Sequence, residues 1–180
     1  MMDFSYTLVR SRRKTLAIQI NPDGSVLLRC PQRLPRREAE AFLERKRPWI
    51  EKHLSARKPV TPLTQEELTR LTAKAKTVLP AQVRHWAQRM GLTFGRVTIR
   101  SQRTRWGSCS AKGNLNFNCL LMLCPERVRT YVVIHELCHR RQLNHSAAFW
   151  AEVARYCPDY PDSRQWLKEN GAALIGRLPR

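Results

Sequence analysis

An α+β fold is predicted, because the sequence shows two different apolar periodicities in separate stretches. Between residues 6 and 30, apolar side chains alternate with polar ones, which is typical of strands with one buried face. Residues 36–54 and 64–90 instead carry apolar side chains at helical spacing. Hydrophobic residues make up 42% of the 180 residues, enough for a packed core. We expect two parts: a small β-hairpin and helix unit over 1–60, and a larger domain over 61–180.

The N-terminal unit is predicted to begin with β-structure. A first strand covers 6–9, a basic turn follows, and a second strand covers 16–20. The turn sequence Asn-Pro-Asp-Gly then leads into a strand over 26–30, which predicts a hairpin. The helical stretch 36–54 contains Pro48, which we expect to divide it into two helices.

The larger domain is predicted to open with a helix after a linker over 55–62. Thr64 precedes two glutamates in the first turn, where negative charge suits a helix N-terminus. Pro80 is expected to kink or split this helix, and Gly91 is a natural C-terminal stop.

Short strands and a further helix are expected after residue 96. Residues 97–99 form one strand, 103–110 a loop or bulged strand, and 115–119 a strand with a polar face. Asn116 and Asn118 on that polar face would line a cleft if the strand lies at the edge of its sheet. Pro125 is expected to open the next helix, because proline is favoured in a first helical turn.

The charge of the chain is strongly basic. Lys and Arg number 33 against 14 Asp and Glu, a formal net charge of +19, and basic clusters occupy 10–14, 33–37 and 45–47. A field of this sign attracts polyanions, so DNA or RNA is a possible partner. A generally basic, solvated surface is the alternative.

The cysteines and the N-terminus favour a reducing compartment. The six cysteines include no C-x-x-C pair, which argues against a cysteine zinc ribbon. The first 16 residues have no apolar signal segment, and no run is long enough to span a bilayer. We therefore expect a cytoplasmic protein with free, mostly buried thiols and no membrane partner.

The chemistry is concentrated in one helix. His135, Glu136 and His139 form the pattern H-E-x-x-H, which places both imidazoles on one helix face, where they can bind one metal ion. The pattern predicts a Zn²⁺ cofactor. Glu136 is then the general base for a metal-activated water that hydrolyses a peptide bond. With three fixed positions the pattern can also occur by chance, although three of the five histidines fall within eleven residues.

A catalytic zinc site needs a third protein ligand. His145 follows His139 by six residues, and Asn144 is a candidate C-terminal cap that would let the chain turn back toward the metal. Glu152 on the next helix is the competing ligand. Cys138 is expected to pack beneath the helix rather than to bind the ion.

The residues around these motifs resemble the YgjP-like metallopeptidases, which are related to the SprT and WLM groups of zinc peptidases. The resemblance spans most of the chain and is weakest over 55–95. It is carried by Arg105–Cys109, His135–His139, Asn144–Ser146, Phe149–Trp150, Cys157–Tyr160, Trp166–Lys168 and the opening hairpin. It implies a zincin-like core that acts on a protein or peptide substrate. The WLM pattern has a histidine at the position of His145, followed by a Phe-Trp-like pair, which favours His145 over Glu152.

Two rival functions stay open on the sequence alone. One is a non-enzymatic nucleic-acid-binding protein with a structural zinc, which the charge favours and the glutamate beside a metal histidine does not. The other is a protease recruited to DNA, by analogy with SprT-type proteins.

Arg103, Arg105 and Tyr131 are candidates for stabilising the oxyanion. Trp106 and Gly107 would either shape the cleft or be structural, and the sequence does not determine the oligomeric state.

Overall fold

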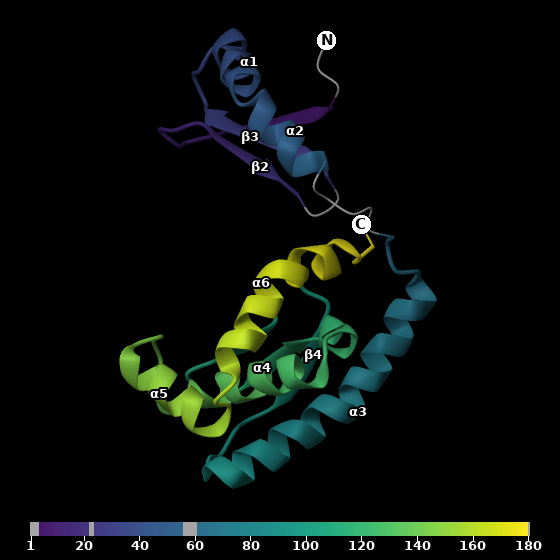
Figure 1. Ribbon diagram of the computed structural model, residues 1–180, viewed down its shortest axis with the longest axis vertical. Coiled ribbons are helices and arrows are strands. Elements are labelled where there is room, and N and C mark those ends of the chain that lie inside the picture. Colours follow the sequence, from purple (N-terminus) through teal and green to yellow (C-terminus); the bar gives the residue numbers. More distant parts are fainter. Residues whose placement is uncertain (1–3, 22–23, 56–60, 180) are drawn as a thin grey trace. The chain divides into compact units, whose positions relative to one another are not determined.

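The structure, a computed structural model, describes residues 4–21, 24–55 and 61–179. The chain divides into two compact units, Met1–Thr61 and Pro62–Arg180 (Figure 1). Each unit combines helices with a three-stranded mixed sheet, so the predicted α+β class is confirmed. Most of the expected linker, residues 56–60, lies outside the described residues.

The N-terminal unit contains one strand pairing that the sequence did not predict. The antiparallel pair is present as β2 (Ala17–Ile20) and β3 (Val26–Pro31), which confirms the hairpin strands. The first strand, β1 (Tyr6–Ser11), pairs in parallel with β3, so β3 is the central strand. The central position explains why Val26, Leu28 and Cys30 are all buried.

Two helices complete this unit, and they confirm the predicted break. α1 spans Arg36–Arg45 and α2 spans Arg47–Ser55. Pro48 lies in the first turn of α2, where its missing N–H breaks no intrahelical bond. Ala39, Leu43 and Ile50 of these helices are buried together with the inward residues of β3.

The C-terminal unit begins with α3 (Gln65–Met90), whose ends follow local sequence rules. Thr64 and Glu67 form a reciprocal capping box, and Gly91 closes the helix with φ 61° in the left-handed region. The helix continues through Pro80, so it is not split there. Ala75, Leu79, Val83, Ala87 and Met90 bury one stripe of α3.

A second sheet carries the scaffold of the site. It consists of β4 (Val97–Arg100), β5 (Gly107–Cys109) and β6 (Leu115–Asn118) in the order β4-β6-β5. β6 pairs in parallel with β4 and antiparallel with β5. The strand expected over 115–119 therefore does not lie at the edge of its sheet: β6 is central and β5 is an edge.

The side chain of Asn118 has a structural role in this sheet. It is buried rather than turned to a cleft, and its amide donates to the carbonyls of Gln102 and Arg105 at 2.6 and 3.1 Å. These bonds satisfy a buried polar group within the protein. Asn118 thus fastens the loop before β5, whereas the amide of Asn116 donates to Ser108 Oγ of β5 at 3.2 Å.

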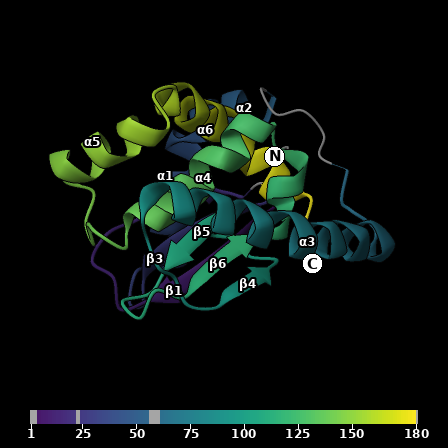
Figure 2. The ribbon, with the colours of Figure 1, turned by 90° about the horizontal axis from the view of Figure 1, so that it is seen from below.

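Helices pack against this sheet and complete the unit. A 3₁₀ helix, η1 (Cys119–Leu123), leads to α4 (Glu126–Cys138), which is followed by α5 (Ala147–Tyr156) and α6 (Tyr160–Gly176). Figure 2 shows α3 and α4 on the same side of the sheet formed by β4, β5 and β6. α4 contacts α3, α5, α6 and β5, so it is the central helix of the unit.

Two further findings bear on the sequence predictions. All six cysteines are free thiols and four of them are buried, as expected. Within the three described ranges, no helix is both long and apolar enough to cross a membrane.

Candidate metal centre

The C-terminal half of α4 holds the first two histidines in a rigid setting. Val133, Ile134 and Leu137 are fully buried, which fixes the rotation of the helix about its axis. His135 and His139 are four residues apart, and their ring centroids lie 5.0 Å from each other. The last helical residue is Cys138, and His139 is the cap.

A short connection brings His145 back to these two residues. The backbone N–H groups of Arg141 and Gln142 both donate to the carbonyl of Cys138 at 3.0 Å, which tightens the chain as it leaves the helix. The cap predicted at Asn144 is wrong, because the helix has already ended six residues earlier. Ser146 then caps α5 by accepting a bond from the Phe149 N–H, so His145 directly precedes a fixed helix start.

The three histidines form a compact set of potential metal ligands. One nitrogen from each of His135, His139 and His145 lies within 4.8 Å of the others. The Nε2 atoms of His135 and His145 are 3.1 Å apart. A zinc ion bound at 2.0–2.1 Å in tetrahedral geometry holds its ligand nitrogens about 3.3 Å apart. The spacing of the imidazoles therefore fits one small cation.

Aromatic side chains from α5 support the imidazoles. Phe149 is fully buried, and its ring centroid lies 4.8, 4.6 and 4.7 Å from the rings of His135, His139 and His145. Trp150 stacks against His145 at 5.8 Å and an interplanar angle of 28°. Phe149 is therefore a core residue that also packs against all three imidazoles.

Hydrogen bonds at Nδ1 orient two of the rings. Nδ1 of His139 lies 3.0 Å from the carbonyl oxygen of Gln142. Nδ1 of His135 lies 3.5 Å from the hydroxyl oxygen of Tyr131, one helical turn earlier. In the tautomer that donates both bonds, each Nε2 keeps a free lone pair, which is the usual arrangement for metal-binding histidines.

Burial favours the neutral form of two of these imidazoles, His135 and His145. Desolvation, with help from the neighbouring histidines and Arg164, lowers the pKa of His135 to about 3. Desolvation, followed by the charges of His139 and Arg164, also lowers the pKa of His145. Burial raises the pKa of Tyr131 to about 12, so its hydroxyl keeps its proton. Neutral imidazoles with available lone pairs are what a metal ion requires.

Glu136 lies beside the cluster in a confined position. Its side chain is buried, and desolvation raises its pKa to about 8, while the positive charge of Arg105 acts in the opposite direction. A Cβ at Gly107 would come within 2.6 Å of Glu136 Oε1. Only glycine lets β5 approach so closely, so Gly107 has a structural role beside Glu136 and also lines the cleft.

An open hollow of about 300 Å³ exposes these groups to a ligand. It is lined by Glu136, Leu143, the three histidines and the whole of β5, Gly107–Cys109. Since β5 is an edge strand, the hollow runs along an edge of the sheet.

The other candidates take different places. The carboxylate of Glu152 forms an ion pair with Arg141 and does not join the ligand cluster. Arg103 donates to the carbonyls of Leu178 and Pro179 at the end of the chain. Cys138 is buried, as expected, and burial raises its pKa to about 12.

A model of the YgjP-like metallopeptidase domain matches this chain over residues 14–70 and 64–170. The chain belongs to the YgjP-like family. Membership confirms the resemblance that the motifs carried, and it makes this protein a metallopeptidase, with the metal cofactor that the name implies.

Two solved structures are similar to this YgjP-like chain, and both are metallopeptidase zymogens. Abylysin of Pyrococcus abyssi is 22% identical, with a TM-score of 0.46, over 51% of this chain and 94% of its own. Jannalysin of Methanocaldococcus jannaschii is 17% identical, also with a TM-score of 0.46, over 51% of this chain and 95% of its own. A comparison with curated proteins gave no match.

Proposed function

We propose that this YgjP-like protein is a zinc-dependent peptidase in which His135, His139 and His145 hold the metal and Glu136 moves the proton. The observation that carries the proposal is the convergence of three imidazoles beside a buried carboxyl group in one open hollow. Three nitrogen ligands leave one position open, which is typical of catalytic rather than structural zinc. A structural zinc would need a fourth protein ligand, and the described ligand cluster contains three residues.

The donor set favours zinc over harder cations. Imidazole suits zinc, copper, nickel and iron, whereas magnesium and calcium prefer oxygen ligands. Glu152 would supply such an oxygen, but its carboxylate is held by Arg141. When bound, zinc acts as a Lewis acid that polarises a carbonyl and lowers the pKa of water.

In this proposal Glu136 acts as the general base and then as the general acid. Its carboxylate accepts a proton from the attacking water and passes that proton to the leaving amine. The raised pKa of Glu136 describes the protein without a metal ion. A dication nearby favours the carboxylate form and brings the side chain into its basic state.

The substrate is a protein or peptide, and we propose that it binds as an added strand. β5 lies at the edge of its sheet and lines the hollow next to Glu136. A free strand edge offers N–H and C=O groups to an extended peptide, which is held through its main chain. Of the oxyanion candidates, Arg105 is the one whose charge acts on Glu136, whereas Arg103 is bound elsewhere.

The test is the substitution Glu136→Gln. Glutamine preserves the shape of the side chain but cannot accept a proton at neutral pH, so we expect full zinc content and a loss of hydrolysis of at least 100-fold. Zinc is measured by mass spectrometry on the same sample that is assayed on a casein or peptide substrate. Undiminished hydrolysis by the variant would remove Glu136 from the mechanism.

We further propose that the N-terminal unit binds a polyanion, with DNA or RNA as the partner. The side chains of Arg12 and Lys14 are exposed. Arg10 is different, because its guanidinium donates to the carbonyls of Gln32 and Leu34 at 3.0 and 2.6 Å and braces the following turn. The basic cluster over 10–14 is therefore partly structural, and its binding surface lies beyond Arg10.

A further inference from the structure

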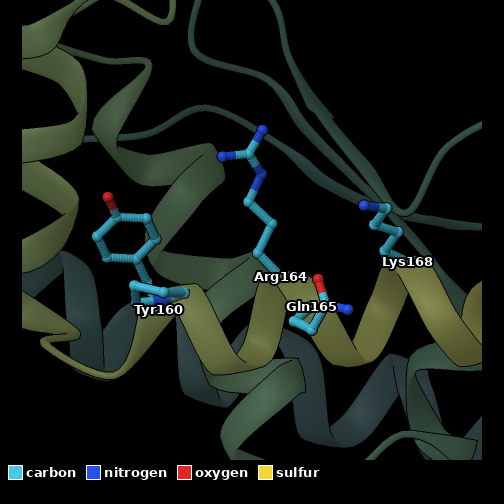
Figure 3. A pocket seen from close by; sticks show the side chains of 5 residues that line it. Tyr160, Arg164, Gln165 and Lys168 are labelled. Atoms are coloured by element: carbon cyan, nitrogen blue, oxygen red, sulfur yellow. The ribbon is translucent and has the colours of Figure 1, made fainter.

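A second hollow lies along α6, outside the metal centre. Its volume is about 590 Å³, and Tyr160, Arg164, Gln165 and Lys168 line it together with Pro161. Figure 3 shows Tyr160, Arg164 and Lys168 projecting from the same side of the helix. Their spacing of four residues explains this, because such residues lie on one helix face, here over about 12 Å.

Aromatic stacking joins this hollow to the histidine cluster. The ring of Tyr160 stacks on Trp150 at 5.1 Å and 19°. Trp150 in turn stacks on His145 at 5.8 Å. The guanidinium carbon of Arg164 lies 4.9 Å from the centre of the Trp150 ring, a cation–π contact. Trp150 thus packs between His145, which lines the metal-centre hollow, and Tyr160 and Arg164, which line the second hollow.

The cations of this hollow are available to a ligand. Arg164 and Lys168 are both exposed, and neither forms an ion pair with any described residue of the chain. The contact with Trp150 restrains the guanidinium of Arg164, and its N–H groups form no hydrogen bond to the residues that the structure describes. A restrained guanidinium fork matches a carboxylate with two parallel hydrogen bonds, and a lysine adds a second positive charge.

We propose that this hollow is a substrate subsite that binds a carboxylate of the peptide, with Arg164 as the main contact and Lys168 as a second cation. The inference rests on the proposed peptidase function and adds a substrate class to it. The carboxylate can come from an acidic side chain or from the C-terminus of the substrate. The first source gives an endopeptidase with a preference for acidic residues, and the second restricts cleavage to sites near the C-terminus.

Binding is measured separately from hydrolysis, so that the two proposals can fail independently. The zinc-loaded Glu136→Gln protein is titrated with four labelled peptides of one sequence. They carry either Glu or Gln at one position, and either a free or an amidated C-terminus. We expect at least one carboxylate to strengthen binding about tenfold, the value of a single charge-assisted bond. The Glu/Gln pair and the acid/amide pair identify which source is bound.

Substitutions then assign the preference to the hollow. Adding Arg164→Gln should reduce the tenfold preference to about twofold, and adding Lys168→Gln as well should abolish it. Arg164→Glu should turn the preference toward a peptide with Lys at that position. The matched control is Arg84→Gln, the same change at an exposed arginine of α3, and it should leave the preference unchanged.

Four outcomes test the subsite. Equal binding of all four peptides, or an unchanged preference in Arg164→Gln, overturns the subsite. The subsite is also overturned if an oligonucleotide binds in an Arg164-dependent way and no peptide carboxylate is preferred. The hollow would then be a nucleic-acid-binding site. An Arg164-dependent preference supports the subsite even if the wild-type protein hydrolyses none of the peptides. The absence of hydrolysis would count against the proposed peptidase function alone.

Discussion

The buried carboxyl group of Glu136 makes the stability of the metal-free protein depend on pH. Burial raises its pKa to about 8 in the folded chain, against 4.5 ordinarily. Between these two values the unfolded chain has released the proton and the folded chain still holds it. The free energy of unfolding therefore falls as pH rises from 4.5, and the loss is complete above pH 8.

The size of the effect follows from the two pKa values. Each pH unit across the window is worth 1.36 kcal/mol, so the full loss is about 5 kcal/mol. The substitution Glu136→Gln removes the ionisation and replaces a neutral carboxyl group with a neutral amide of the same shape. We expect the variant and the wild type to be equally stable near pH 4.5. Above pH 8 the variant should be more stable by several kcal/mol.

The assay is urea denaturation of both proteins at pH 5, 7 and 9 with a chelator present. The chelator is needed because a bound dication stabilises the carboxylate and removes the effect. The lowered pKa of His135 destabilises both proteins as pH falls below 6.5, and it cancels in their difference. Parallel stability curves with no divergence between pH 5 and 9 would refute the argument from burial.

Three other outcomes follow from the structure. Gly107→Ala should lower hydrolysis about 100-fold, because its Cβ displaces the carboxylate of Glu136; a well-folded variant with normal rates would contradict this contact. Removing the metal with a chelator should lower the free energy of unfolding by about 4 kcal/mol, compared with the protein in free zinc at about 1,000 times the dissociation constant. Thermal melting measures the difference, and an unchanged melting temperature would mean that the ion does not bind the folded site. Neutralising Arg12, Arg13 and Lys14 together should weaken DNA binding and flatten its salt dependence in a titration series; equal affinity and slope would exclude this cluster.

Local patterns were sufficient to predict most of the elements and the members of the candidate site. The helix with His135 and His139 followed from apolar residues and the four-residue spacing. Thr64 and Gly91 marked the ends of α3, because caps act on neighbouring backbone groups. A short connection made His145 reachable, since few residues separate it from the helix end.

Contacts between distant segments were not predictable from these patterns. The parallel pairing of β1 with β3 and the central place of β6 depend on strand order, which alternation does not encode. Asn118 is buried because loop carbonyls from other residues accept its amide protons. The partnership of Tyr131 with His135 could have been found, because it has the same four-residue spacing.

The zinc content of single-residue variants tests the central claim most directly. We expect one zinc per chain in the wild type by mass spectrometry. Glu152→Gln should keep it, because that carboxylate is paired with Arg141. His145→Ala should lose it, because only two imidazoles remain in the cluster. Full zinc occupancy in His145→Ala, with loss in Glu152→Gln, would contradict the three-histidine site.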